Sequence, residues 1–69
     1  MDARGLNCPL PALRAQKALQ ALAPGQTLTV LATDPAARID IAHLCNTDGH
    51  VLLSLAEEGS LLRFVIVRG

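Results

Sequence analysis

The residue of this chain best suited to covalent chemistry is Cys8, in the segment Cys8-Pro9-Leu10-Pro11. A cysteine attacks other atoms through its thiolate, and a helix N-terminus favours that charged form. The residue before a proline is pushed out of the helical region, whereas proline itself is tolerated in a first turn. We therefore expect Cys8 to be the N-cap of a helix, with Pro9 first and Pro11 third. In this position only the Leu10 amide remains to donate to the sulfur, and the pKa of Cys8 should lie modestly below that of free cysteine.

The alternative is a purely structural role, in which Cys8 is a small apolar residue at a junction between elements. Cys45 follows Ile41 by one helical turn, on the expected inner face of a second helix. A buried structural thiol is the favoured reading, and a second sulfur-handling or regulatory thiol is the alternative. His43, Cys45 and His50 match no zinc spacing, so neither a metal nor a cofactor is expected. We expect His43 to point outward and His50 to begin a strand, half-exposed.

Four residues after Cys8 are candidates for docking a partner: Leu10, Leu13, Arg14 and Lys17. All four fall off the apolar face of the expected helix, so the alternative is an ordinary solvated surface. Two exposed leucines beside a nucleophile could anchor a partner, with the cations on the rim. Before the cysteine, Gly5 marks a turn, and Arg4 with Asp2 should steady the loop. Together with the two prolines, Gly5 and Arg4 are the expected supports of the site.

The elements that must position these residues follow from periodicity and from turn residues. The first helix should run from Pro9 to about Leu22, and a second from the cap Asp34 to about Cys45, ended by Asn46–Gly49. The order is βαβαββ, which predicts an α/β (α+β) two-layer sandwich, a four-stranded mixed sheet with two helices on one face. The expected strands are a short one within Met1–Arg4, then Gln26–Ala32, His50–Ala56 and Leu61–Arg68, the last two joined by Glu57–Ser60.

The second face of this sheet should carry apolar side chains as well. Leu31 faces away from Val30, and Val65 and Val67 face away from Phe64. Scattered apolar side chains are normal on protein surfaces. A contact surface for a partner or a second copy is the sharper interpretation.

Composition excludes several classes of function. The 69 residues predict one domain spanning 1–69, with Phe64 as the single aromatic residue. Six Lys and Arg balance six Asp and Glu, so neither nucleic acid nor a membrane surface is an expected partner. No apolar run approaches a membrane span and no signal-peptide pattern begins the chain, so the cytoplasm is expected. Two cysteines in such a chain do not predict a disulfide framework.

The chain resembles the TusA/SirA family of sulfur carriers over essentially its whole length. The resemblance rests on Asp2-Ala3-Arg4-Gly5-Leu6-Asn7-Cys8-Pro9-Leu10-Pro11, on Pro24-Gly25-Gln26 and on Thr33-Asp34-Pro35-Ala36, with Asp40-Ile41 and Gly49-His50 further along. It implies the same βαβαββ sandwich, with Cys8 carrying sulfane sulfur as a persulfide. It also implies a cysteine desulfurase or rhodanese-like donor, an acceptor protein, and a pathway such as tRNA thiolation, sulfur oxidation or molybdenum-cofactor formation.

The leading hypothesis is therefore a sulfur carrier, or sulfurtransferase, acting through Cys8. The alternative is a non-catalytic interaction module or a thiol-based regulatory module on the same fold. A thiol-disulfide oxidoreductase is disfavoured because the chain has no Cys-x-x-Cys pair. A monomer or a weak homodimer is expected.

Overall fold

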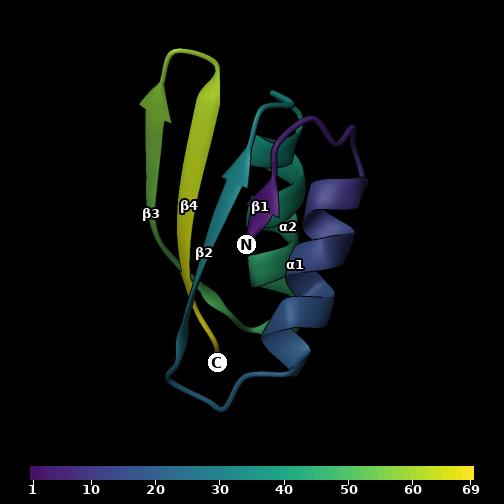
Figure 1. The fold of residues 1–69 in the computed structure, drawn as a ribbon. Helices are drawn as coiled ribbons and strands as arrows, with labels where there is room; N and C mark the ends of the chain where they lie inside the picture. Colours follow the sequence, from purple (N-terminus) through teal and green to yellow (C-terminus); the bar gives the residue numbers. More distant parts are fainter.

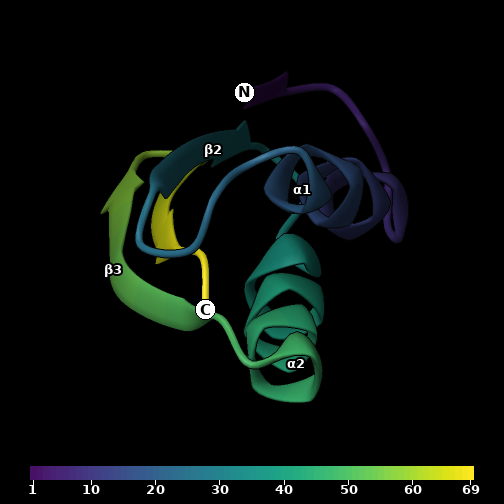
Figure 2. The same cartoon turned by 90° about the horizontal axis from the view of Figure 1, so that it is seen from below.

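The computed structural model describes residues 1–69, arranged as one sheet covered by two helices (Figure 1). The elements are β1 (Asp2–Ala3), α1 (Leu10–Gln20), β2 (Thr27–Ala32), α2 (Ala37–Asp48), β3 (Val51–Glu58) and β4 (Leu61–Val67). Seen from below, both helices lie on the same side of the sheet (Figure 2). The predicted βαβαββ order and two-layer sandwich are thus confirmed.

The sheet has the strand order β1-β2-β4-β3. The short β1 runs parallel to β2, with Asp2 opposite Leu31. The other two pairings, of β2 with β4 and of β3 with β4, are antiparallel, which makes the sheet mixed. Because β1 and β2 are parallel neighbours, α1 must cross between them, and this crossing carries the Cys8 segment to one end of the sheet.

The core fills the space between the sheet and the two helices. Phe64 and Ile66 of β4 and Val30 of β2 are fully buried, with Leu19 of α1 and Ile41 of α2 packed in the same cluster. These side chains obey the period of their element, two along the strands and 3.6 along the helices. The apolar periodicity of the sequence therefore fixes which face of each helix meets the sheet.

Helix α2 ends three residues later than the sequence predicted, and it begins at Ala37, two residues after Pro35. It continues through Asn46 and Thr47 to Asp48, and Gly49 ends it in the left-handed conformation, with φ of 76°. Glycine adopts that conformation without steric cost, so it is the usual residue just after a helix. The prediction that Asn46 begins the break was wrong because the polar residues there face solvent while the helix continues.

An irregularity in β3 sets which of its side chains point inward. Leu52 pairs with Ile66 and Ser54 with Val65, so Leu53 is an extra residue between two paired positions. Without it, Leu52 and Leu55, three positions apart, would face opposite sides of the sheet. The bulge turns both toward the core, where they pack against the buried cluster.

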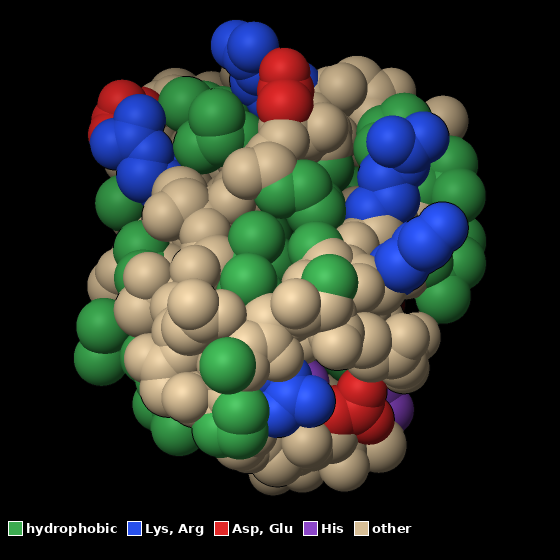
Figure 3. Space-filling model, turned by 60° about the horizontal axis from the view of Figure 1, so that its bottom comes forward, with side chains coloured by type: hydrophobic (Ala, Val, Ile, Leu, Met, Phe, Trp, Pro, Cys, Tyr) green, Lys and Arg blue, Asp and Glu red, His purple; other side chains and the backbone are tan.

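The sheet face without helices carries apolar side chains, as predicted. Val51 and Leu53 are exposed, and Leu31, Val65 and Val67 are half-buried. On the molecular face shown in Figure 3, hydrophobic side chains are broken up by polar and charged ones. Neither helix is long and apolar enough to cross a membrane.

Cys45 lies in the core of the structure with 3% of its surface exposed, which confirms the expected inner-face position.

Cys45→Ser should lower the free energy of unfolding by about 1–2 kcal/mol, because it places a hydroxyl where an apolar sulfur is packed. Urea denaturation followed by circular dichroism measures this change. Cys8→Ser is the matched control, since Cys8 is exposed, and it should leave stability within about 0.5 kcal/mol of wild type. Equal losses in the two variants would contradict this account.

Candidate functional site

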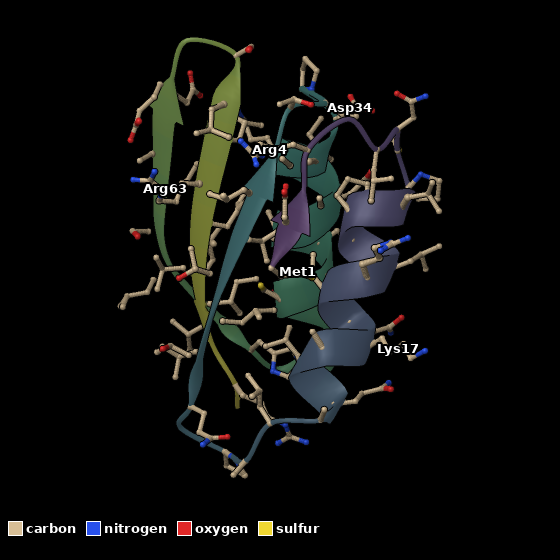
Figure 4. The ribbon with its side chains drawn as sticks, in the orientation of Figure 1. Met1, Arg4, Lys17, Asp34 and Arg63 are labelled. Carbon is tan, nitrogen blue, oxygen red and sulfur yellow. The ribbon has the colours of Figure 1, made fainter.

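Cys8 lies in the loop that joins β1 to α1, at one end of the molecule. Gly5 opens the turn of this loop with φ of 79°, a conformation that side chains disfavour. The Gly5 amide donates to Thr33 Oγ1 at 3.0 Å, which ties the loop to the end of β2. Figure 4 shows Asp34 at this same end, beside the loop, while Lys17 projects from α1.

Asp34 connects the Cys8 loop to the beginning of α2. Its Oδ2 accepts from the backbone amide of Cys8 at 2.7 Å, and its Oδ1 accepts from the amide of Ala36 at 2.9 Å. These two bonds, with Cys8 first, hold the pKa of Asp34 below its usual value. Asp34 is not the N-cap of α2, as the sequence predicted, because the helix begins at Ala37 with Ala36 as its N-cap; Asp34 instead holds the turn before the helix and positions the cysteine.

The start of α1 differs from the sequence prediction by one residue. The helix begins at Leu10, so Pro9 occupies the N-cap position and Pro11 is the second helical residue. The Leu10 amide donates to the carbonyl of Asn7 at 2.8 Å and is not available to the sulfur. Cys8 consequently stands outside the helix, and the expected cap geometry at its sulfur was wrong.

The sulfur of Cys8 instead meets a carboxylate. Its thiol donates to Asp40 Oδ2 of α2, with 2.6 Å between the sulfur and the oxygen. This hydrogen bond is the main cause that raises the pKa of Cys8 above its ordinary value, followed by partial desolvation and by the negative charges of Asp40 and Asp34. The prediction of a lowered pKa was therefore wrong, because Cys8 lies outside α1 and its thiol contacts a carboxylate.

Beside Cys8 an open groove of about 350 Å³ runs between α1 and α2. It extends from Pro9 and Asp40 at the cysteine end to Gln16 and Asp48, which are joined by a 3.2 Å hydrogen bond. Its wall includes Leu13, which is 53% exposed. The rest of its lining is Ala12, Ile39, His43, Leu44 and Thr47. The groove gives the cysteine an apolar neighbourhood with acidic ends.

Sequence reasoning missed the contribution of α2 to this region. Ile39, 74% exposed, falls off the buried stripe that Ile41 and Cys45 follow, and an apolar residue outside the stripe was the available signal. Asp40 lies 32 residues from Cys8, and no local pattern links the two. Only the packing of α1 against α2 brings them together.

The four predicted docking residues are all exposed and lie on one side of α1. Leu10 and Leu13 are 45% and 53% exposed, and Leu13 lines the groove. Arg14 and Lys17 line a separate hollow beside Met1. Successive helical residues point about 100° apart, so Leu10 falls between Lys17 and Arg14 around α1, with Leu13 next to Lys17.

The other residues that the sequence analysis singled out make their contacts away from the Cys8 sulfur. Arg4 pairs with Asp2 at 3.0 Å, and its side chain and amide bring the pKa of Asp2 down to about 2. His43 is exposed as predicted, and His50 is half-exposed with its Nδ1 accepting from the terminal Gly69 amide. Burial raises the pKa of the Cys45 thiol.

The double role of Asp34 makes a testable prediction. Asp34→Ala removes the acceptor for the Cys8 and Ala36 amides, and it should cost about 1–2 kcal/mol of unfolding free energy while speeding hydrogen exchange at the Cys8 amide. Asp48→Ala is the control, because Asp48 is also an exposed carboxylate with one side-chain hydrogen bond. Unchanged exchange at Cys8 in the Asp34 variant would show that the loop holds its shape without the tether.

Comparison with known proteins gives the family. The family model described as sulfurtransferase TusA matches residues 1–68. A putative sulfur carrier protein of Neisseria meningitidis is 47% identical over 66 residues, covering 96% of this chain and 89% of the relative. The sulfur carrier protein TusA of Allochromatium vinosum is also 47% identical over 66 residues, covering 96% and 87%.

A solved structure agrees with this assignment. The crystal structure of the SirA-like protein from Desulfitobacterium hafniense has a TM-score of 0.88 and 30% sequence identity, and the match covers 100% of this chain and 95% of that one. The matching fold, the matching motif around Cys8 and the sulfur-carrier relatives lead to one conclusion. The chain belongs to the TusA family of sulfur carriers.

Proposed function

We propose that Cys8 is the residue of this sulfur carrier that binds the transferred sulfur, and that it holds this sulfane sulfur as a persulfide. The observation that carries the proposal is the exposed Cys8 sulfur at the end of an open groove, with the other thiol buried in the core. A carrier needs one accessible sulfur and no resolving thiol, because a neighbouring cysteine would displace the cargo as a disulfide. Residues 1–69 act in this proposal as a single TusA-like domain.

The transfer step needs no group that the site lacks. Cys8 sulfur attacks the terminal sulfur of a donor persulfide, and a new sulfur–sulfur bond forms as the donor's own bond breaks. The electron pair of the broken bond stays on the donor sulfur, which takes up the proton that Cys8 loses. Delivery to an acceptor thiol repeats the exchange in the opposite sense, with Cys8 as the leaving thiol.

Members of a sulfur-carrier family work between a donor protein and an acceptor protein. For this chain we propose a cysteine desulfurase or a rhodanese-like donor, and an acceptor in tRNA thiolation, sulfur oxidation or a related sulfur-trafficking pathway. The relay is proposed to be cytoplasmic, because both thiols are free and a reducing compartment keeps them so. A monomer, or at most a weak homodimer, leaves the Cys8 end open to either partner.

A thiol-based sensor is the competing function. Peroxide oxidation and persulfide loading both proceed through the thiolate. The Asp40 hydrogen bond raises the pKa of Cys8 and so lowers the thiolate fraction for both reactions. Mass spectrometry separates the two functions, because a sensor gains oxygen with peroxide whereas a carrier gains one sulfur atom from a desulfurase and cysteine.

Cys8→Ser should abolish persulfide loading, whereas Cys45→Ser should load normally. The reason is that the Cys8 sulfur is exposed and the Cys45 sulfur is enclosed by the core. Each protein is incubated with a cysteine desulfurase and cysteine, and intact-mass spectrometry looks for the gain of one sulfur atom. Loading of the Cys8 variant at the wild-type level would overturn the assignment.

Charge reversal at Arg14 and Lys17 should slow sulfur transfer without changing thermal stability. A partner that reaches Cys8 must cover the start of α1, and charges on the rim of an interface act mainly on the rate of association. The double variant to Glu should lose roughly tenfold in transfer rate at low salt, with the loss shrinking near 1 M salt, where the Debye length is about 3 Å. The transfer rate is measured at several salt concentrations by stopping the reaction at fixed times. Wild-type rates at low salt would show that the partner does not dock on this side of α1, and the sheet face without helices would become the better candidate.

A further inference from the structure

Two carboxylates from different elements hold Cys8 at once. Asp34, in the segment before α2, accepts from its backbone amide at 2.7 Å, and Asp40 within α2 accepts from its thiol at 2.6 Å. The first contact persists whatever the state of the sulfur, because it involves only the main chain. The second exists only while the sulfur carries a proton, because a thiolate has nothing to donate.

No nearby cation offsets these two negative charges. Arg4 is engaged with Asp2 and Arg38 with Glu57, whereas Arg14 and Lys17 line a separate hollow beside Met1. His43, one turn beyond Asp40 in the groove, makes its hydrogen bond within α2. The charged groups that act on the thiol are therefore both acidic, and both favour its neutral form.

We propose that Asp40 is a positioning residue that makes the reactivity of Cys8 depend on whether sulfur is loaded. In the empty carrier it holds Cys8 as an oriented, neutral thiol of low reactivity. In the loaded carrier this control is largely lost. The proposal rests on the persulfide function given above and adds a control that favours reaction of the loaded state.

Loading changes the atom on which Asp40 acts. With glutathione persulfide as donor, a bond forms between Cys8 Sγ and the sulfane sulfur. The sulfur–sulfur bond of the donor breaks, and glutathione leaves with the electron pair and the proton from Cys8. The sulfur moves at an unchanged oxidation level. Sγ then has no proton to donate, and the terminal sulfur, which now bears the proton or the charge, lies about 2.05 Å further out.

Coulomb repulsion falls with distance and is screened more strongly at an exposed atom, so Asp40 opposes ionisation of the terminal sulfur less than ionisation of the free thiol. The empty carrier should therefore resist electrophiles and oxidants at neutral pH, while the loaded carrier ionises and reacts. This asymmetry disfavours capture of the empty carrier by side reactions between donor and acceptor.

The test measures alkylation of Cys8 by iodoacetamide as a function of pH, with peptide mass spectrometry to separate thiol from persulfide products. Asp40→Asn preserves size and removes the charge. In the empty protein it should shift the alkylation profile to lower pH and speed alkylation at neutral pH roughly three- to tenfold. After loading with glutathione persulfide, the same variant should change the persulfide profile by less than half as much.

Two further variants separate this role from a structural one. Asp40→Glu keeps the charge on a longer side chain and should restore most of the wild-type profile. Asp48→Asn removes a carboxylate at the far end of the same groove and should leave the profile unchanged. Circular dichroism confirms that each variant is folded. If Asp40 had only a structural role, Asp40→Asn would not shift the pH profile of alkylation, and Asp40→Glu would have no shift to reverse.

The outcomes are distinct. An unshifted profile in empty Asp40→Asn, or equal shifts in the empty and loaded forms, would overturn the proposal while leaving the carrier function intact. Failure of wild-type Cys8 to take up sulfur from any persulfide donor would overturn the carrier function itself. The smaller shift in the loaded form is the one result that supports the proposal.

Discussion

The site depends on one side chain, the carboxylate of Asp34, which joins two segments that are remote in the sequence. One of its oxygens holds the main chain of Cys8, and the other holds the first residues before α2. The Cys8 segment has few other anchors, because it lies outside both the sheet ladder and α1. Together with the packing of α1 against α2, this carboxylate holds the Cys8 sulfur within hydrogen-bonding range of Asp40.

The two prolines of the motif and this carboxylate act on different properties of the cysteine. Pro9 and Pro11 have no amide hydrogen, so the start of α1 exposes fewer donors than an ordinary helix terminus. That loss removes much of the advantage a helix would give a thiolate. The site thus combines an accessible sulfur with acidic neighbours that raise the pKa of the Cys8 thiol.

Much of this structure could be predicted from the sequence because it rests on local patterns. Alternation along Gln26–Ala32 and Leu61–Arg68 and the spacing of Ile41 and Cys45 indicate which faces are buried, and they led to the correct layers and element order. The exposure of Cys8 was also correct. Contacts between residues far apart in the sequence were not predicted. The contact of Cys8 with Asp40 spans 32 residues and depends on how two helices pack.

Smaller errors also have physical causes. The bulge at Leu53 could not be predicted from residue types, because the residues around it form a continuous apolar run. The end of α2 was placed too early because Asn and Asp are common in turns, yet they continue a helix when a glycine further on provides the left-handed residue. In each case tertiary packing overrode a local preference.

The bulge in β3 has a consequence for the assembly of many copies of the chain. β3 is the outer strand of the sheet, and an outer strand offers unpaired amides and carbonyls along its free edge. A regular edge beside a partly apolar face would be a template for edge-to-edge polymerisation. The extra residue at Leu53 interrupts the hydrogen-bonding spacing of that edge and increases its twist, so a second strand cannot pair along its full length. The extra residue that turns Leu52 and Leu55 toward the core of one molecule thereby also protects the population from aggregation.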